Sequence, residues 1–381
     1  MIQLKMTKNI ALIELQPHPT TIGGVNTHIE YLSRELKKRG HKVTIITSRP
    51  SSKLLSKNKL RKDIVYVGIE HKKFDDFKGI NKLFYYLWRF FFEIIFVISL
   101  TKTLRRSEYN IIDVQSPITP ALACSFSGKK YFITAHGIHH QGFKKLYSSR
   151  KDVIVSRIGS TIYKIFERYN IKRATRIICL GQDTLDYYSK FNDCVIIPNG
   201  IDTEKFKSKN LKRKKVIISV GRFTEQKQVD KLVKAMDNLP DYVLKVIGLG
   251  PLEEQIKTMC SKRKNCEFLG YKDQEEISLY LQEARFMILP SLFEGLPISM
   301  LEGMSCGVIP VTTMVGDIPI VVKEGKTGFF LKNNSPEEII KTVRKAEKTN
   351  VTKISRSCTN LIKKDYAWEK ITTRFLEAWE K

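Results

Sequence analysis

The chain has 381 residues, which is more than one hydrophobic core usually serves, so two domains are expected. Apolar residues make up 42% and charged residues 28%, a balance that excludes a disordered chain. Its 66 Lys and Arg outnumber 39 Asp and Glu. The formal charge of +27 fits nucleic acid, anionic lipid or an anionic substrate as partner, or a solvated basic surface.

The cysteines argue for reduced thiols. They are odd in number, scattered and free of any C-x-x-C pair, which argues against a disulfide framework and against a zinc site. They are Cys124, Cys179, Cys194, Cys260, Cys266, Cys306 and Cys358. The chain starts MIQLKMTKN, with no apolar signal-peptide core. A cytoplasmic protein is expected.

The first half alternates strand and helix patterns. Asn9–Leu15 and Val43–Thr47 are predicted strands, and between them apolar residues recur at 4-3-4 spacing in a helix that stops at Gly40. Further short strands are predicted at Ile111–Val114, Tyr131–Thr134, Thr175–Leu180 and Val195–Ile197. Strands separated by helices indicate parallel pairing through right-handed crossovers.

A long apolar segment, residues 83–100, lies in the most basic region of the chain. Residues 37–106 hold 18 Lys or Arg against 5 Asp or Glu. Arg89 and Glu93 interrupt the segment four residues apart, where they can pair on one helical face, which argues against a membrane-spanning helix. Two interpretations stay open: a helix buried on the sheet, or an interfacial helix at a membrane.

The turn cluster Pro198–Asp202 and the Lys-rich run Lys205–Lys215 indicate a domain boundary. We place the first domain at 1–198 and the second at 199–365. Strands are predicted again at Lys215–Val220, Val243–Ile247, Glu267–Leu269, Phe286–Leu289, Val308–Val311 and Thr327–Leu331. The sequence therefore predicts two doubly wound α/β domains with a ligand cleft between them.

Two motifs in the first domain are candidate ligand contacts. Gly23 and Gly24 precede the first helix, where backbone can approach a phosphate, although such a pair also serves as a simple turn. They form no G-x-G-x-x-G, so a nicotinamide cofactor is not indicated. His136 follows a strand and can contact a sugar hydroxyl, shuttle a proton or be structural. His139 and His140 follow it, but no Asp, Glu or Cys lies close by, so no metal is expected.

The second domain carries charged and glycine-rich loops after its strands. Arg222 and Lys227 can bracket one diphosphate, or simply be two more cations in a basic chain. Gly250, in Gly-x-Gly-Pro, can present backbone to a flat ligand or form a tight turn. Glu294 and Glu302 flank a helix start at Pro297, where free N–H groups bind phosphate.

The order of these motifs resembles retaining family GT4 of the glycosyltransferases, also called glycosyltransferase group 1. The resemblance covers the whole chain, with Glu294 and Glu302 matching its Glu-x7-Glu signature. It implies the GT-B fold: two Rossmann-like doubly wound parallel-sheet domains with an interdomain cleft. It also implies that the terminal helix, 366–381, packs back on the N-terminal, acceptor-side domain.

The resemblance implies a role for each matching residue. Arg222 and Lys227 would hold the donor diphosphate, Glu302 the ribose hydroxyls and Glu294 the hydroxyls of the transferred sugar. The remaining expected contacts are backbone or ring contacts to the donor: Gly23, Gly24, His136, Gly250, Leu296, Pro297 and Ile298. Three positions depart from the family pattern: Gln228 replaces a glycine, Gly181 replaces a serine, and Gly316–Ile320 replaces Gly-Gly-Ile-Pro-Glu.

We therefore expect a metal-independent enzyme that moves a hexose from a nucleoside-diphosphate-sugar, such as a UDP- or GDP-hexose, to a glycan or lipid-linked acceptor. No cofactor is expected, and no nucleic acid. The basic segment 53–106 is expected to contact anionic membrane, at the inner face of the cell membrane. Two alternatives are a GT-B nucleotide-sugar epimerase and a non-catalytic basic binding protein.

Overall fold

The computed structural model describes residues 7–18, 24–50, 61–71, 82–138, 153–209 and 213–380. The chain divides into two compact units, Met1–Pro198 with Thr372–Lys381, and Asn199–Ile371. The chain passes from the second unit back to the first between Ile371 and Thr372, inside the last helix, α15 (Trp368–Glu380). Tyr366–Ile371, which the sequence analysis assigned to the first domain, thus belongs to the second unit.

The first unit is built on a parallel sheet in the order β3-β2-β1-β4-β5-β6-β7. Its described strands are β1 (Asn9–Ile13), β2 (Lys42–Arg49), β3 (Ile64–Glu70), β4 (Ile111–Val114), β5 (Phe132–Ala135), β6 (Arg176–Cys179) and β7 (Cys194–Ile196). The strand order reverses between β1 and β4. This is the topological switch point, beside whose carboxyl ends ligands bind in doubly wound sheets.

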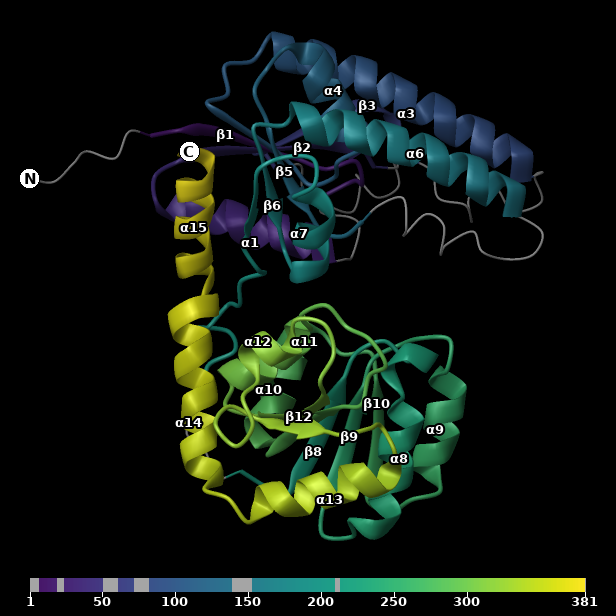
Figure 1. Cartoon of the computed structure of the whole chain (residues 1–381), viewed down its shortest axis with the longest axis vertical. Helices are drawn as coiled ribbons and strands as arrows, with labels where there is room; N and C mark the ends of the chain where they lie inside the picture. Colours follow the sequence, from purple (N-terminus) through teal and green to yellow (C-terminus); the bar gives the residue numbers. More distant parts are fainter. Residues whose placement is uncertain are drawn as a thin grey trace, which may run out of the picture. The chain divides into compact units, whose positions relative to one another are not determined.

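Helices cover both faces of this sheet. They are α1 (Gly24–Lys38), α3 (Lys82–Arg105), α4 (Thr119–Ser127), α6 (Val153–Arg173) and α7 (Gln182–Tyr188). Helices α3, α4 and α6 lie together on one face, and α1 lies on the other (Figure 1). Among the described residues, no helix combines the length and apolarity needed to cross a membrane.

Helix α3 contains the long apolar segment of the sequence, and one of its faces is buried. Phe92, Phe96, Leu100 and Leu104 follow each other at four-residue spacing with no exposed surface. The predicted Arg89–Glu93 pair is confirmed, with 2.8 Å between Nε and Oε1. Burial of this stripe supports the buried-helix interpretation for that face, whereas the opposite face of the helix is exposed.

Strand β3 was not predicted from the sequence. It lies at the edge of the sheet, where Gly68 takes a positive φ of 73° and the register with β2 shifts after Ser48. A side chain at Gly68 would contact the backbone of Phe96 on α3 at 3.4 Å. The glycine that allows this close helix contact also weakens the strand pattern of the sequence.

The second unit repeats the same topology with the parallel order β10-β9-β8-β11-β12-β13. Its described strands are β8 (Val216–Val220), β9 (Val243–Ile247), β10 (Cys266–Gly270), β11 (Phe286–Leu289), β12 (Ile309–Thr313) and β13 (Phe329–Leu331). The switch point here lies between β8 and β11. Both sheets are doubly wound and parallel, as predicted.

The helices of the second unit also form two layers. They are α8 (Val229–Ala235), α9 (Glu253–Ser261), α10 (Gln274–Glu283), α11 (Ile298–Ser305), α12 (Ile318–Val321), α13 (Pro336–Glu347) and α14 (Val351–Leu361). Helices α8, α9 and α13 pack together, whereas α11 packs on α14 and β12 (Figure 1). Each unit has its own buried apolar core.

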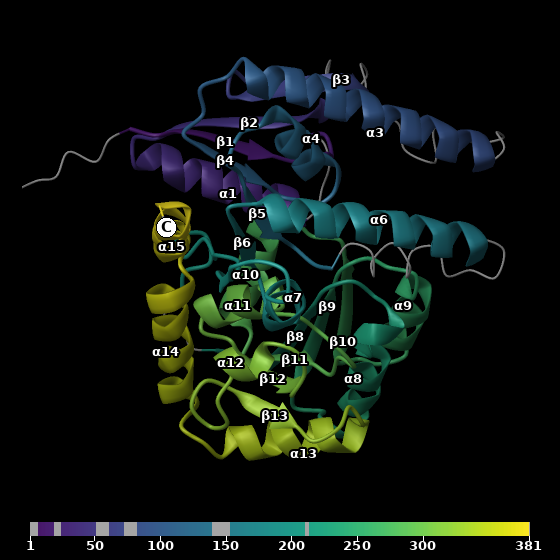
Figure 2. The same ribbon diagram turned by 45° about the horizontal axis from the view of Figure 1, so that its top comes forward.

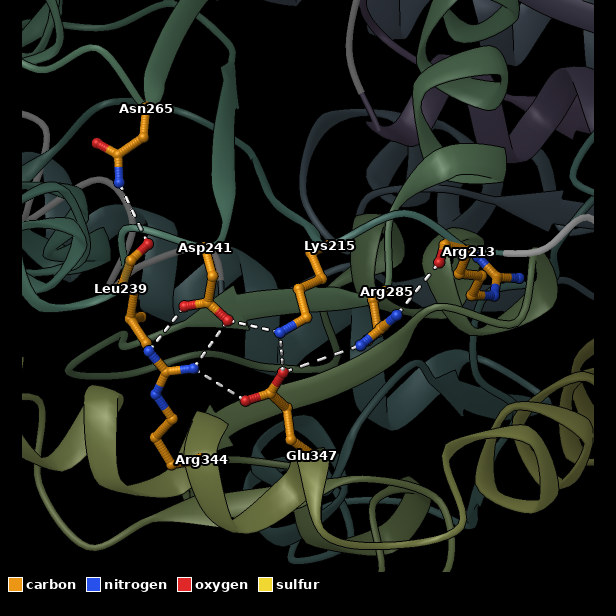
Figure 3. Close-up of polar contacts among 8 residues, drawn as sticks. All are labelled: Arg213, Lys215, Leu239, Asp241, Asn265, Arg285, Arg344 and Glu347. Atoms are coloured by element: carbon orange, nitrogen blue, oxygen red, sulfur yellow. Dashed lines mark hydrogen bonds and ion pairs between the residues drawn. The ribbon is translucent and has the colours of Figure 1, made fainter.

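An ion-pair network joins α13 to the amino-terminal edge of the second sheet (Figure 3). Glu347 contacts Lys215 at 3.0 Å and Arg344 at 3.0 Å, and Arg344 contacts Asp241 at 2.7 Å. Lys215 and Arg285 each directly precede a strand, so the network lies at the edge opposite the strands' carboxyl ends. It stabilises the frame and leaves the opposite edge for a ligand.

The turn Pro198–Asp202 packs against the start of α15. Ile201 N–H donates to the carbonyl of Tyr366 at 2.7 Å, and Trp368 N–H donates to that of Ile201 at 3.2 Å. A side chain at Gly200 would come within 2.4 Å of the Trp368 ring. The glycine of this motif therefore serves packing within the second unit.

Candidate active site

The switch point of the second unit brings two loops together. Strand β8 pairs with β11, so the loop that follows Val220 lies beside the loop that follows Leu289. Leu292 N–H donates to the carbonyl of Gln226 at 2.9 Å, and the Gln226 amide donates to the carbonyl of Phe293 at 2.6 Å. These bonds hold the loop that carries Arg222 and Lys227 against the loop that carries Glu294, although the two loops are far apart in sequence.

Lys227 and Glu294 form an ion pair with 2.5 Å between Nζ and Oε1. The side chain of Glu294 is 7% exposed and that of Lys227 is 21% exposed, so the pair is largely withdrawn from water. Such a pair resists salt screening more than a surface pair does. Lys227 thus enters any ligand complex with its charge already partly compensated.

Arg222 differs from Lys227 in its surroundings. It is exposed, and no described residue forms a hydrogen bond or ion pair with its guanidinium. A guanidinium offers a rigid fork of donors that matches phosphate oxygens. Arg222 is therefore the uncompensated cation on this surface.

Gln228, which follows Lys227, adopts a left-handed conformation with a φ of 50°. It is the only non-glycine residue with positive φ in the described part of the chain. Its side chain donates to the carbonyl of Glu225 at 2.7 Å, which supports the strained turn. The sequence analysis flagged this position because the family usually has glycine there, and the backbone explains that preference.

Helix α11 begins directly after the Glu294 loop, with Pro297 at its N-cap. The N–H groups of Leu296, Ile298 and Ser299 donate to no acceptor among the described residues. Orphan N–H groups at a helix start carry a positive dipole and suit an anion. The first of these N–H groups, that of Leu296, lies on the loop that carries Glu294.

Glu302 lies on the second turn of α11 and is 8% exposed. Burial raises the pKa of Glu302 to about 8, and the nearby charge of Lys205 lowers it by less. No described residue donates a hydrogen bond to its carboxyl group. Glu302 is thus a buried acceptor that hydroxyl donors from a ligand would satisfy.

Two glycines allow neighbouring loops to pack closely against the loop that carries Glu294 and the loop that carries Arg222. Gly316, with a φ of 55°, lies so close to Glu294 that a side chain there would come within 2.0 Å of its carbonyl oxygen. A side chain at Gly250 would come within 2.4 Å of the Phe223 carbonyl oxygen. Gly250 therefore has a packing reason to be glycine. Gly316, which the sequence analysis noted only as a departure, holds the Glu294 loop.

Of the candidate residues of the first unit, Gly24 follows β1 at the switch point, and His136 follows β5, the strand beyond β4. Gly23 is outside the described residues; Gly24 is the first residue of α1 and has open space where a side chain would project. His136 follows β5, and its Nε2 lies 2.9 Å from Oε1 of Gln115, which follows β4. Sequence reasoning missed Gln115 and Asp113, although both are polar residues at the end of an apolar strand.

Within the described residues, no group of three or more His, Cys, Asp and Glu side chains is arranged to hold a metal ion. His139 and His140 fall outside the described residues. Lys227 and Glu294 are the predicted site residues that the structure shows in direct contact.

Comparison with solved structures identifies the fold. Sucrose-phosphate synthase from Thermosynechococcus elongatus superposes with a TM-score of 0.75, 98% coverage of both chains and 17% identity. Alr3699/HepE from Anabaena, solved in complex with UDP-glucose, gives a TM-score of 0.69 with 13% identity, 97% coverage of this chain and 98% of that one. The fold is GT-B, the two-domain architecture of a large class of glycosyltransferases.

Two family models together span almost the whole chain. The model of "Glycosyltransferase Family 4" matches residues 22–205, and that of "Glycosyl transferases group 1" matches residues 200–368. The chain belongs to the group 1, family 4 glycosyltransferases that these two models describe, and it is therefore a glycosyltransferase. It is 28% identical over 297 residues to the Escherichia coli UDP-Gal:alpha-D-GlcNAc-diphosphoundecaprenol alpha-1,3-galactosyltransferase, covering 70% of this chain and 74% of that protein.

Proposed function

We propose that this glycosyltransferase moves a hexose, with retention of configuration, from a UDP- or GDP-hexose to a glycan or lipid-linked acceptor. The Lys227–Glu294 pair carries the proposal, because it joins a phosphate-binding cation to a sugar-binding carboxylate on one surface. The E. coli relative is named for UDP-Gal and a diphosphoundecaprenol-linked acceptor, and the Anabaena structure holds UDP-glucose. Both names support this donor class, and the first supports a lipid-linked acceptor.

Different polar groups of the site bind different parts of the donor. Arg222 is exposed and uncompensated, so it forms the strongest new contact with the diphosphate. Lys227 is shared between the diphosphate and Glu294. The N–H groups at the start of α11 cap a phosphate, and Glu302 accepts hydrogen bonds from the ribose hydroxyls.

The reaction needs no protein nucleophile. The acceptor oxygen attacks the anomeric carbon from the face on which the carbon–oxygen bond to the diphosphate breaks. The acceptor proton passes to an oxygen of the departing phosphate. Arg222 and Lys227 stabilise the negative charge that builds on that phosphate, and Glu294 orients the sugar through its hydroxyls. The family resemblance adds Gly23, Gly24 and His136 as further proposed contacts to the donor.

The proposed role of Lys227 in binding the donor diphosphate is tested with the variant Lys227→Ala, and Lys234→Ala serves as the control. Lys234 lies on α8 of the same unit and its side chain is 51% exposed, so the control removes the same charge away from the site. We expect Lys227→Ala to lower kcat by about a hundredfold or more, as removal of one charge-stabilising donor does. Normal turnover by this variant would contradict the phosphate assignment.

Lys227→Ala also leaves Glu294 without its cation, so its effect on folding is measured separately. The double variant Lys227→Ala with Glu294→Gln removes the stranded charge. Thermal unfolding that recovers in the double variant while activity stays lost separates binding from stability. The donor is identified by a thermal-shift screen of nucleotide-sugars, because a ligand stabilises the folded state that binds it.

Metal independence is part of the same proposal. Arg222 and Lys227 supply positive charge where a divalent ion would otherwise be needed. We expect activity to survive dialysis against EDTA. Strong inhibition that one divalent ion reverses would refute this point.

We further propose that the first unit contacts an anionic lipid surface through α3 and α6. Their outward faces carry Phe90 (67% exposed), Phe91 (58%), Ile98 (62%) and Ile165 (62%). The two helices are joined through the Tyr163 hydroxyl, which donates to Glu93 at 3.1 Å, and both run past the sheet (Figures 1 and 2). Residues 37–106 of the sequence also hold an excess of 13 positive charges. Exposed aromatic residues and a positively charged sequence region together suit an anionic interface at the inner face of the membrane.

Liposome co-sedimentation tests this contact. The double variant Phe91→Ser with Ile98→Ser removes two exposed apolar side chains, and Leu279→Ser, at a position 61% exposed on α10, is the control. Wild type and control are expected to bind vesicles that contain anionic lipid at low salt, and the double variant to bind less. Equal binding by all three would contradict the proposal.

A further inference from the structure

Three consecutive residues of the loop after β8 each contact another part of the second unit. The Gln226 amide donates to a carbonyl of the loop that carries Glu294 at 2.6 Å, and Nζ of Lys227 pairs with Glu294 itself at 2.5 Å. The next side chain reaches a different loop, because Oε1 of Gln228 accepts from Nδ2 of Asn334 at 3.3 Å. Lys227 is therefore flanked by two residues that tie its loop to separate parts of the structure.

Asn334 lies in the short connection between β13 and α13. Its neighbour Ser335 is the N-cap of α13: the Ser335 hydroxyl accepts from the N–H of Glu338 at 3.3 Å, and the Ser335 N–H donates to Oδ1 of Asn333 at 2.9 Å. Helix α13 in turn packs on β13 and α8. Asn334 thus offers Gln228 an anchor whose position is set by the frame of the second unit.

The backbone of Gln228 has a conformation that favours glycine. Its φ is 50°, and no other non-glycine residue in the described part of the chain has a positive φ. A side chain in this conformation costs free energy that glycine avoids, and such residues cluster at functional sites. The Gln228 side chain makes two hydrogen bonds, with Asn334 and with the Glu225 carbonyl, which we call the brace. Glycine would relieve the turn and lose the brace.

We propose that Gln228 is a positioning residue whose brace holds Lys227 in the place from which it contacts the donor diphosphate. The inference rests on the proposed role of Lys227 in donor binding. A loop that is restrained before the ligand arrives has less to order on binding, and a cation fixed in advance stabilises phosphate charge more strongly. Gln228 itself touches no part of the donor and acts through Lys227.

Two variants remove the brace in different ways. Gln228→Gly deletes the whole side chain and installs the residue typical of the family. Asn334→Ala deletes only the anchor and leaves the sequence of the Lys227 loop unaltered. Gln255→Ala, at an exposed position on α9, removes an amide elsewhere in the second unit and is the control. In Gln228→Gly the relief of the turn opposes the loss of hydrogen bonds, so we expect a thermal unfolding midpoint close to that of the wild type.

Amide hydrogen exchange tests the brace without any ligand. The N–H of Lys227 donates to the Thr224 carbonyl at 3.0 Å, so its exchange reports how often this turn opens. We expect Gln228→Gly and Asn334→Ala to speed exchange at this amide about fivefold, the value of one hydrogen bond, and Gln255→Ala to leave it unchanged. Unchanged exchange in folded Asn334→Ala would overturn the proposal.

Calorimetric titration with UDP and with GDP tests the link to Lys227. We expect Gln228→Gly and Asn334→Ala each to weaken binding of the nucleoside diphosphate about fivefold, and Gln255→Ala to bind as the wild type does. Both variants are then made in Lys227→Ala, where no further loss is expected because the brace has no cation to position. Equal losses with and without Lys227 would refute its action through Lys227.

Failure of this proposal differs from failure of the proposed function. If Lys227→Ala binds both nucleotides as tightly as the wild type, or the wild type binds neither, the proposed function is wrong at the donor site, and exchange still decides whether Gln228 holds the loop. If Lys227→Ala weakens binding and the two brace variants do not, the proposed function stands and the positioning role is refuted. A lower unfolding midpoint with unchanged exchange and binding would refute it as well, because Gln228 would then serve stability alone.

Discussion

Replacing Glu302 by glutamine removes a buried ionisable group while keeping the shape of the side chain. Burial raises the pKa of Glu302 from 4.5 to about 8 because the ionised form loses its hydration. In the unfolded chain the group ionises near its ordinary pKa, so the folded state binds the proton more tightly. Below about pH 4.5 both states are protonated and Glu302 costs nothing; the cost grows as the pH rises and levels off above about pH 8.

The size of this effect on the free energy of unfolding follows from the two pKa values of Glu302, 4.5 in the unfolded chain and about 8 in the folded protein. At neutral pH the unfolded state is ionised and the folded state is still mostly protonated, which corresponds to a penalty of roughly 3 kcal/mol. Glu302→Gln should therefore match the unaltered enzyme in stability near pH 4.5 and exceed it by roughly 3 kcal/mol near pH 7. Urea unfolding of the second unit, followed at several pH values, measures the difference.

Exposed Glu254, on α9, supplies the matched control. Glu254→Gln removes the same charge from the surface and should leave stability almost independent of this titration. A stability difference between Glu302→Gln and wild type that stays constant from pH 4.5 to pH 8 would refute the reasoning, because it would mean that Glu302 is ionised normally in the folded state.

Ligand binding provides a second readout of the same group. Hydroxyl donors from the ribose favour the ionised carboxylate and should lower the pKa of Glu302, so nucleotide binding should release up to about one proton near neutral pH. Calorimetry in two buffers of different ionisation enthalpy measures this release, and Glu302→Gln should abolish it. Proton release that persists in the variant would assign it to another group.

The remaining predictions concern the frame of the second unit. Gln228→Val should destabilise it by about 1–2 kcal/mol, because a β-branched residue tolerates the positive φ poorly, whereas Gln228→Asn should be tolerated; urea midpoints distinguish them. Gly316→Ala should cost roughly 2 kcal/mol or more and lower activity through the Glu294 loop, whereas Gly295→Ala, which has open space for a side chain, should be close to neutral in thermal unfolding. Glu347→Gln should cost about 1 kcal/mol at low salt and less at about 1 M salt, because Glu347 pairs with three cations, of which Lys215 and Arg344 keep Asp241 as a partner. Glu276→Gln, which breaks a single surface pair, should leave the urea midpoint almost unchanged.

Local patterns in the sequence were enough to predict the architecture. The 4-3-4 spacing before Gly40 predicted α1, and the short apolar runs after turn residues predicted most strands of both sheets. Strand β3 was missed because Gly68 serves a contact with α3, which no local pattern records. Element type follows from periodicity, which is local, whereas an edge strand depends on what packs against it.

The candidate site was only partly accessible from the sequence. Arg222, Lys227, Glu294 and Glu302 were chosen because charged residues follow apolar strands and flank a helix start, and their order matched a known family. The contact of Lys227 with Glu294, 67 residues away, was not predicted. Gly316 and Gln115 were not assigned to the site, because each acts on a residue that is distant in the chain.

The sequence by itself determined the two doubly wound units, the family and the residue types that can meet a nucleotide-sugar. Only the tertiary structure decided that Glu302 is buried without a hydrogen bond from the described residues, that Glu294 shares its charge with Lys227, and that Asp113 reaches His136 through Gln115. The physical reason is that helix and strand patterns arise from neighbours along the chain. Burial, pKa and the direction of a hydrogen bond arise from groups that only the folded sheet brings together.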